Sequence, residues 1–187
     1  LKCYAEFERR LFATLSDYTD PIEGVIETLD IIRKSGVKIG STTGYTSEMM
    51  KVVVPAAESK GYHVDNCVTS DGLPGGRPLP FMIYKNMCDL AVASRFSVLK
   101  YGDTISDIKE SVNAGVWTVG VIMGSSELGL TEKEIAEMPS DELKRRMNAV
   151  RNRMYAAGAH YVVESVRELP ALIESINARM SSDNFMM

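Results

Sequence analysis

Short β-rich runs alternate with amphipathic helical segments along nearly the whole chain, and this order constrains the fold more than any other feature. Gly36 and Gly115 each end a helical pattern just before a β-rich run. Strands separated by helices of this length form right-handed βαβ units, in which the strands run parallel and helices cover both faces. The sequence therefore predicts an α/β fold built on a parallel sheet.

The same patterns predict the position of each element. Pro55 lies inside one helical pattern, where a missing N–H predicts a kink or a break. We expect the residues after 180 to form a frayed tail, 181–187. Strands are expected at 37–42, 67–69, 98–101, 117–122 and 161–163, and helices at 1–15, 25–35, 47–60, 81–93, 106–114, 132–138, 141–157 and 166–180.

Composition excludes several classes of protein. The 187 residues are 45% hydrophobic and carry a formal charge of −4, which favours one globular domain and argues against nucleic acid or a membrane surface as a partner. The basic cluster at 144–153 is interpreted as a solvated helix face. Three dispersed cysteines form no C-x-x-C pair, which favours a reducing cytoplasm, and no apolar run reaches the ~18 residues that cross a bilayer.

Ligands of parallel α/β sheets bind beyond the carboxyl ends of strands, so the residues that follow each strand are the candidates for a functional site. After the first strand, the segment 41–45 offers the Thr43 hydroxyl and backbone amides beside a helix amino terminus, which suits a phosphate oxygen. The alternative is an ordinary helix cap and tight turn.

After the strand at 98–101, the segment Gly102-Asp103-Thr104-Ile105-Ser106-Asp107 places two carboxylates four residues apart beside a glycine. Mg²⁺ binds one or two carboxylates while it keeps several waters, so Asp103 and Asp107 are candidate metal residues. In the alternative reading, Asp103 caps the following helix and Asp107 only favours its dipole.

Between these segments lies Gly75-Gly76-Arg77-Pro78, whose guanidinium could neutralise a phosphoryl group, although a lone Arg-Pro is commonly only a loop. The order of the three features is informative. A hydroxyl after one strand, a cation in the next loop and paired aspartates after a later strand resemble the second, third and fourth motifs of the haloacid dehalogenase (HAD) superfamily.

Longer segments narrow the resemblance to the phosphonoacetaldehyde hydrolase family, over about Asp20 to Ile176. They are 40–46 (GSTTGYT), 114–121 (AGVWTVGV), 124–131 (GSSELGLT) and 158–161 (GAHY). This resemblance implies a HAD-like Rossmannoid core, Mg²⁺ as cofactor, a homodimer, and hydrolysis of phosphonoacetaldehyde to acetaldehyde and phosphate. It further implies that Thr43 binds a phosphoryl oxygen, Arg77 counters its charge, Asp103 binds Mg²⁺, Asp107 supports the metal through hydrogen bonds or water, and Tyr45 and Gly44 line the substrate pocket.

Two parts of the family pattern have no match in this chain. Members use an Asp at the end of the first strand as nucleophile and a cap-domain Lys that forms an imine with the aldehyde. We therefore expect an amino-terminally truncated chain, in which 1–19 are the last cap helix and hinge and 20–180 are the core. The missing strand would lie centrally, so the isolated chain is expected to be inactive, and its open strand edges and apolar slot to make it unstable.

Rival hypotheses remain open. A HAD phosphatase or sugar-phosphate mutase would share the metal site without the imine Lys, and a non-catalytic phosphate-binding module would keep the fold without the nucleophile. A receiver domain fits less well, because its acidic pair follows its first strand and no such pair precedes Val37 in this chain. His63 and His160 are interpreted as structural, since neither has a second ligand at metal spacing.

Overall fold

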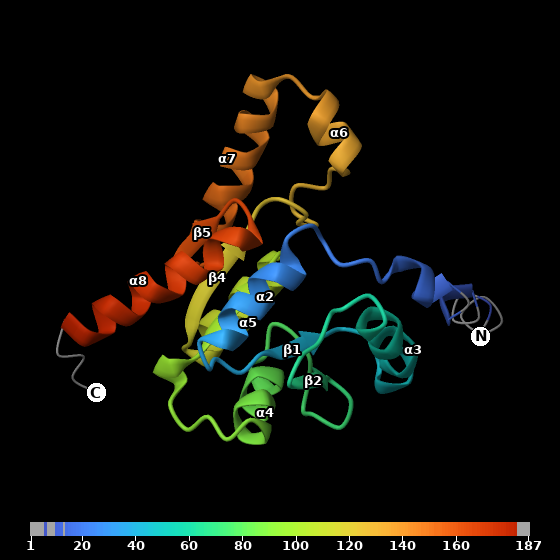
Figure 1. The fold of residues 1–187 in the computed structure, drawn as a ribbon, viewed down its shortest axis with the longest axis vertical. Coiled ribbons are helices and arrows are strands. Elements are labelled where there is room, and N and C mark those ends of the chain that lie inside the picture. Colours follow the sequence, from blue (N-terminus) through green and yellow to red (C-terminus); the bar gives the residue numbers. More distant parts are fainter. Residues whose placement is uncertain (1–5, 7–9, 13, 183–187) are drawn as a thin grey trace.

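The computed structural model describes residue 6, residues 10–12 and residues 14–182, and Figure 1 shows their arrangement. Each β-rich run is followed by a helix, as the sequence pattern predicts. The strands are β1 (Gly40–Thr43), β2 (Asn66–Thr69), β3 (Leu99–Gly102), β4 (Trp117–Val121) and β5 (Tyr161–Val163). The helices are α2 (Val25–Lys34), α3 (Ser47–Glu58), α4 (Phe81–Asp89), α5 (Ile105–Ala114), α6 (Glu132–Glu137), α7 (Ser140–Ala156) and α8 (Leu169–Ser182), with 3-10 helices η1 (Leu15–Tyr18), η2 (Arg95–Ser97) and η3 (Val166–Glu168).

Every strand pairing in the described part of the chain is parallel, but the strands form two sheets rather than one. One sheet has the order β1-β2 and the other the order β3-β4-β5. Gly40 lies opposite Asn66 in the first, and Leu99 lies opposite Trp117 in the second. β1 and β3 therefore each keep one edge without a strand partner. The predicted parallel α/β architecture is confirmed.

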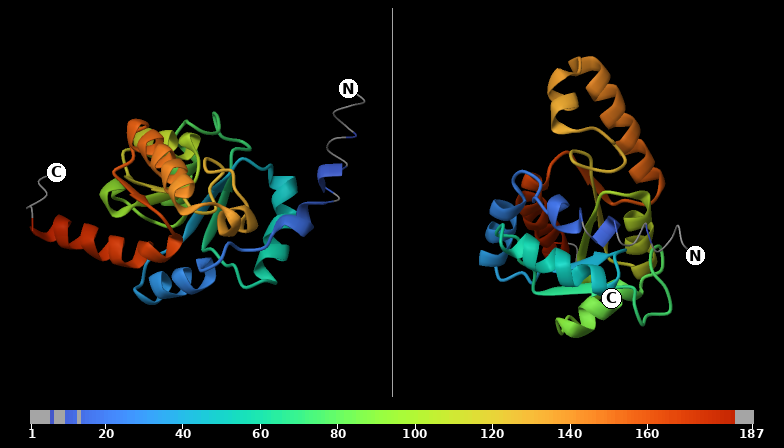
Figure 2. Two further views of the ribbon diagram at one scale, coloured as in Figure 1. Left: turned by 90° about the horizontal axis from the view of Figure 1, so that it is seen from above. Right: turned by 90° about the vertical axis from the view of Figure 1, so that its right-hand side faces the viewer.

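Two helical layers enclose the three-stranded sheet. On one face, α2 and α8 pack with buried Val119, Val121 and Val163 around a single apolar cluster. On the other face, Ile108 of α5 and Met154 of α7 pack against Ile122 just after β4. The views in Figures 1 and 2 show α2 and α8 together on one side of this sheet.

The two-stranded sheet is linked to the larger one through α4. This helix packs against β1, β2 and α5. Within it, buried Asn86 donates from Nδ2 to the Ser41 carbonyl of β1 at 2.9 Å. α3 lies beside η1, and Lys60 joins the segment before α2 by an ion pair with Asp20 at 2.7 Å. These contacts fix β1 relative to β3, although no backbone hydrogen bond joins the two strands.

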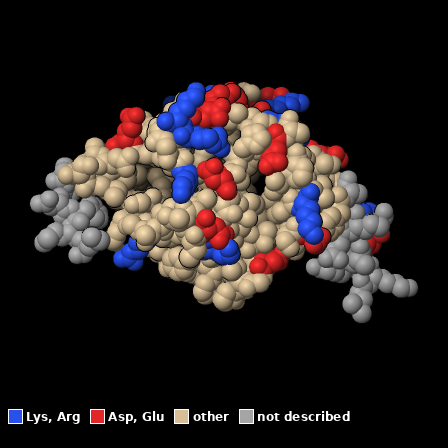
Figure 3. Space-filling model, turned by 60° about the horizontal axis from the view of Figure 1, so that its bottom comes forward, with Lys and Arg blue, Asp and Glu red and all other residues tan. Residues whose placement is uncertain are grey.

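α6 and α7 form an arm that extends away from the sheets (Figure 1). On this arm, Arg145 and Arg146 both pair with Glu142, at 2.8 and 2.7 Å. The interpretation of the basic cluster as a solvated helix face is consistent with these pairs. Positive and negative residues also intermingle on the face of the molecule in Figure 3. Among the described residues, no helix is long and apolar enough to cross a membrane.

Some predicted boundaries were wrong. The first strand begins at Gly40 instead of residue 37, because the Ile39 N–H donates to the Asp65 carboxylate at 2.6 Å and not to a strand. α4 ends at Asp89 because Ala91 takes a left-handed conformation with φ of 54°. α3 is continuous through Pro55, so the predicted break is absent.

At the two ends of the chain, the described residues cover the predicted elements only in part. The described residues of the segment 10–14 are helical, and the rest of the predicted helix 1–15 lies largely outside the described residues. α8 continues through Ser181 and Ser182, which the sequence assigns to a frayed tail. A bond from Ser181 Oγ to the Asn177 carbonyl, at 2.9 Å, closes this last helical turn. Residues 183–187 lie outside the described residues.

Candidate active site

The turn from β3 into α5 is a capping box. Thr104 is the N-cap, and its hydroxyl accepts the Asp107 N–H at 3.1 Å. In return, Asp107 Oδ2 accepts from the Thr104 hydroxyl at 2.6 Å and from the Thr104 N–H at 3.3 Å. The alternative prediction that Asp103 caps this helix is wrong, because Thr104 holds that position and Asp103 is directed elsewhere.

Gly102 is required by the position of Asp107. A Cβ at residue 102 would lie 2.8 Å from Cγ of Asp107 and closer still to its Cβ. The glycine thus lets the α5 carboxylate approach the end of β3. A glycine can also admit a ligand to the backbone, but at this position the space is taken by Asp107.

Asp107 belongs to a buried cluster of four charges. Its Oδ1 lies 3.1 Å from Nε of Arg77 and 3.2 Å from Nζ of Lys100. Glu110, one helical turn further along α5, lies 3.2 Å from Nε of Arg77 and 3.5 Å from Nζ of Lys100 through Oε2. Two cations therefore balance two anions between β1, β3, α5 and the loop that carries Arg77.

The charge cluster keeps Asp107 ionised. Burial by itself would raise the pKa of the Asp107 carboxyl, but Lys100, the Thr104 hydroxyl and Arg77 outweigh burial and lower that pKa below its ordinary value. Both carboxylate oxygens of Asp107 are occupied by these partners. Asp107 in this arrangement supports its neighbours and leaves no oxygen free for a direct metal bond.

Thr42 joins the cluster to β1. Its hydroxyl accepts from Lys100 at 2.7 Å and from Nη2 of Arg77 at 2.9 Å, and its carbonyl accepts from Nη2 of Arg77 at 2.6 Å. Successive carbonyls of a strand point alternately to its two sides. The Ile39 carbonyl accepts the Asp65 N–H and so points toward β2. The Thr42 carbonyl therefore faces the open edge, where Arg77 takes the place of a strand partner.

Thr43, Gly44 and Tyr45 lie at the carboxyl end of β1, but no hydrogen bond or ion pair joins them to the charge cluster. The Thr43 hydroxyl accepts the Tyr45 N–H at 3.1 Å, and Tyr45 is exposed. No atom of the described residues lies within 4 Å of a Cβ built on Gly44. The backbone around Gly44 is thus open to an approaching molecule.

Asp103, which follows β3 directly, is anchored by a residue outside the charge cluster. Its Oδ2 accepts from the N–H and the hydroxyl of Ser126, at 3.0 and 2.8 Å. No described residue donates to Oδ1, so one carboxylate oxygen remains available. A single free carboxylate fits the share that a protein contributes to a largely hydrated Mg²⁺. The described residues contain no group of three or more His, Cys, Asp and Glu that could hold a metal ion.

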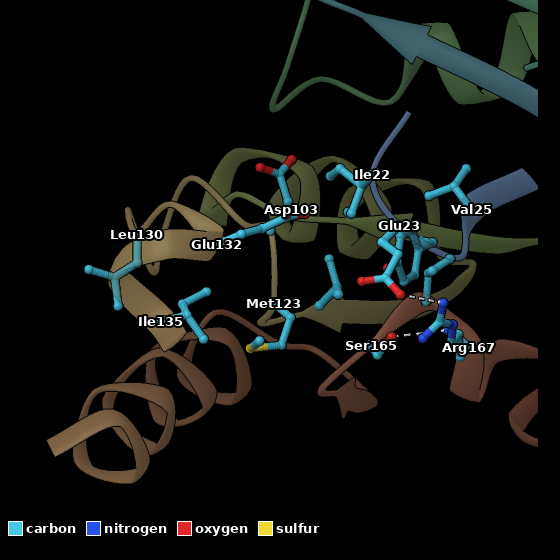
Figure 4. A pocket seen from close by; sticks show the side chains of 15 residues that line it. Ile22, Glu23, Val25, Asp103, Met123, Leu130, Glu132, Ile135, Ser165 and Arg167 are labelled. Atoms are coloured by element: carbon cyan, nitrogen blue, oxygen red, sulfur yellow. Dashed lines mark hydrogen bonds and ion pairs between the residues drawn. The ribbon is translucent and has the colours of Figure 1, made fainter. Parts of the chain in front are cut away.

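A cavity of about 510 Å³ opens beside Asp103. Its wall is mainly apolar, with Met123 after β4, Leu130 and Ile135, and an ion pair of 2.8 Å between Arg167 and Glu23 at its edge. Figure 4 shows the Asp103 carboxylate directed away from Met123 and Ile135. Thr43, Tyr45 and Arg77 do not line this cavity. Lys100, Asp107 and Glu110 do not line it either, so the cavity is separate from the charge cluster.

The sequence did not predict Thr42, Lys100 and Glu110. A signal was present for Lys100, because a lysine inside a short, partly buried strand favours a nearby anion. Glu110 is three residues beyond Asp107 and so shares its face of α5. Thr42 gave no signal, because it is one of several hydroxyl residues in the segment.

The two histidines have structural surroundings. His160 Nδ1 accepts the Thr118 N–H at 2.9 Å, and the backbone N–H of His160 donates to the Thr118 carbonyl. His160 therefore prolongs the pairing of β4 with β5. Its ring packs edge-on against Trp117. His63 offers its carbonyl to Arg33 at 2.8 Å. Neither histidine lies in the charge cluster.

Comparison with known proteins shows to which family the chain belongs. A model of the haloacid dehalogenase-like hydrolases matches residues 2–121. The phosphonoacetaldehyde hydrolases of Parabacteroides distasonis and Bacteroides fragilis are each 56% identical to the chain over 94% of its length. The chain belongs to the phosphonoacetaldehyde hydrolase family of HAD-like hydrolases.

A solved structure supports the same assignment. The crystal structure of a phosphonoacetaldehyde hydrolase-like protein from Oleispira antarctica matches 97% of the chain with a TM-score of 0.91 and 32% identity. The chain spans about two thirds of the length of these proteins, 67% and 66% for the two hydrolases and 66% for the solved structure. The HAD-like fold expected from the motif order is therefore confirmed.

Proposed function

We propose that the protein to which these residues belong hydrolyses phosphonoacetaldehyde to acetaldehyde and phosphate with Mg²⁺. The observation that carries the proposal is the ion pair of Arg77 with Asp107, 3.1 Å apart beside β3, in a chain 56% identical to proteins named phosphonoacetaldehyde hydrolase. The fixed guanidinium suits a dianionic phosphonate, and the ionised carboxylate beside it suits a hydrated cation.

In this reaction Arg77 offsets the charge of the phosphoryl group, and Thr43 donates its hydroxyl to a phosphoryl oxygen. Gly44 leaves space for the substrate beside the backbone, and Tyr45 lines the pocket. The placement of Thr43, Gly44 and Tyr45 at the carboxyl end of β1 supports their roles, since ligands of parallel sheets bind there.

Asp103 supplies one carboxylate oxygen to Mg²⁺, and Asp107 acts through hydrogen bonds or water. The free Oδ1 of Asp103 supports the first role, and the occupied oxygens of Asp107 support the second. When bound, the cation would withdraw negative charge from the phosphoryl group.

The nucleophilic Asp and the imine-forming Lys of the family pattern have no counterpart in this chain, so we assign them to residues outside it. A strand seated between the open edges of β1 and β3 would bring such an Asp to the carboxyl end of the sheet. In the same scheme, 1–19 are a cap helix and hinge and 20–180 are the core. We further propose that the protein is a homodimer and that it is cytoplasmic, and the free thiols of Cys67 and Cys88 are in line with the second proposal.

Borohydride trapping tests this chemistry against the rival activities. The protein expressed from the whole reading frame is incubated with phosphonoacetaldehyde and borohydride, which reduces an imine to a stable amine. We expect irreversible loss of activity and an adduct on one lysine by mass spectrometry. Unchanged activity without an adduct would favour a HAD phosphatase or mutase, and absence of any phosphate release would favour a non-catalytic module.

A further inference from the structure

The buried charge cluster contains a carboxylate that the proposed reaction does not use. The Glu110 side chain is fully buried, with 0% of its surface exposed, while Asp107, Lys100 and Arg77 retain 4%, 14% and 22%. Glu110 Oε1 has no hydrogen-bond partner among the described residues. A buried carboxylate with an unsatisfied oxygen is a poor way to stabilise a fold, since apolar side chains of similar volume commonly do so at lower cost.

Glu110 Oε2, in contrast, is the point where three donors meet. It accepts from Nε of Arg77 at 3.2 Å and from the Thr42 hydroxyl at 3.3 Å, and it lies 3.5 Å from Nζ of Lys100. Lys100 offsets the second negative charge, so the cluster is neutral overall. Glu110 is therefore placed to hold Arg77 without leaving an uncompensated anion.

The contacts of Arg77 use one edge of its guanidinium. Nε faces Asp107 and Glu110, and Nη2 donates to the carbonyl and hydroxyl of Thr42. Nη1 donates to no described residue. Because the guanidinium is a rigid plane, fixing Nε and Nη2 also fixes the direction of Nη1.

We propose that Glu110 is a positioning residue, which holds the Nε–Nη2 edge of Arg77 so that Nη1 is presented to the phosphoryl group of the substrate. This inference rests on the proposed function for the identity of the anion. It differs from a purely structural role in acting only through Arg77. It also differs from a direct electrostatic role, since a carboxylate near the anion site would by itself repel phosphate, and removing it would strengthen binding.

The test is a double-mutant cycle in the protein expressed from the whole reading frame, in which Arg77 and Glu110 keep their numbers. Inorganic phosphate with Mg²⁺ is the probe, and calorimetry gives its dissociation constant for wild type, Glu110→Gln, Arg77→Met and the double variant. We expect Glu110→Gln to weaken phosphate binding about tenfold, the size of a lost charged hydrogen bond. The same change should have no effect in the Arg77→Met background. An equal effect in both backgrounds, or tighter binding in Glu110→Gln, would overturn the proposal.

A second readout is independent of phosphate. In ¹⁵N-labelled protein, the Nε–H signal of Arg77, assigned by its loss in Arg77→Met, reports on its carboxylate partners. We expect a slowly exchanging signal in wild type that shifts in Glu110→Gln and stays unchanged in Lys109→Gln, an exposed position on the same helix. An Arg77 signal that exchanges freely in wild type, or that ignores Glu110→Gln, contradicts positioning by Glu110.

The two readouts separate this inference from the proposed function. If wild type binds no phosphate while the Nε–H signal behaves as expected, the anion assignment fails and the Glu110 contact stands. If Glu110→Gln does not fold, Glu110→Asp replaces it, which keeps the charge and withdraws the carboxylate from Nε. That variant should show the same shift and the same loss of phosphate affinity, and wild-type behaviour of Glu110→Asp would overturn the proposal.

Discussion

At the scale of single residues, Gly102 gives the most local prediction. Gly102→Ala would place a methyl group against Asp107, whose side chain is buried and held by Arg77 and Lys100. Such overpacking should lower the free energy of unfolding by about 1–3 kcal/mol in urea titrations. Gly44→Ala is the matched control, since no described atom lies near its Cβ, and it should leave the stability within about 0.5 kcal/mol. Equal stability of the two variants would disprove the required close approach.

The candidate residues that could be predicted from the sequence are those that follow strands. Asp103 and Asp107 stand out because two carboxylates follow one strand, and Arg77 because its loop follows another. Lys100 and Glu110 were missed, because their importance depends on a contact between β3 and α5 that no local spacing reveals. The geometry between elements, rather than the residue types, was the missing information.

At the scale of elements, helix and strand order followed from the alternating pattern, whereas one boundary depended on a contact distant in sequence and another on an unusual backbone conformation. The start of β1 is set by the Asp65 carboxylate on the Ile39 N–H, 26 residues apart. The end of α4 is set by an alanine in a left-handed conformation, a position where glycine is the usual residue. Local propensity cannot predict either boundary.

The start of α5 should depend on one hydroxyl. Thr104→Ala removes the N-cap and the 2.6 Å bond to Asp107, and we expect a loss of about 1 kcal/mol in the free energy of unfolding. Thr104→Ser keeps both hydrogen bonds and should restore most of that loss. Thermal or urea unfolding of the three proteins measures it, and an alanine variant as stable as wild type would show that the capping box is dispensable.

The β4–β5 pairing should weaken in mild acid. Burial and, to a smaller extent, Arg179 lower the pKa of His160 below its ordinary value of 6.5. The unfolded chain therefore takes up this proton at a higher pH than the folded chain, and protonation also removes the acceptor that Nδ1 offers to Thr118. Stability contributed by neutral His160 is present above about pH 6.5 and is lost as the pH falls through the window below it.

Urea titrations between pH 5 and pH 8 test the contribution of His160 to the free energy of unfolding. His160→Gln does not titrate, so its free energy of unfolding should vary less with pH across this window than that of wild type. His63→Gln is the comparison at the other histidine. A pH dependence in His160→Gln as steep as that of wild type would assign the effect to other groups.

At the scale of the whole molecule, the two separate sheets predict a marginal fold. Among the described residues, β1 and β3 each have an edge without a strand partner, and the Thr42 carbonyl on one edge accepts a hydrogen bond from Arg77 alone. Open edges pair readily with other chains, so the isolated chain should melt at low temperature and aggregate. Light scattering during a thermal melt measures both, and a cooperative high-temperature transition of soluble monomer would contradict the expectation.

The central claim is that these residues form one part of a phosphonoacetaldehyde-hydrolysing site whose nucleophile lies outside them. Phosphorus NMR of phosphonoacetaldehyde with Mg²⁺ tests it most directly, with the 187-residue chain and the protein of the whole reading frame in parallel. The account predicts inorganic phosphate from the longer protein and none from the chain alone. Phosphate released by the chain alone, or an unchanged phosphonate signal with the longer protein, would contradict it.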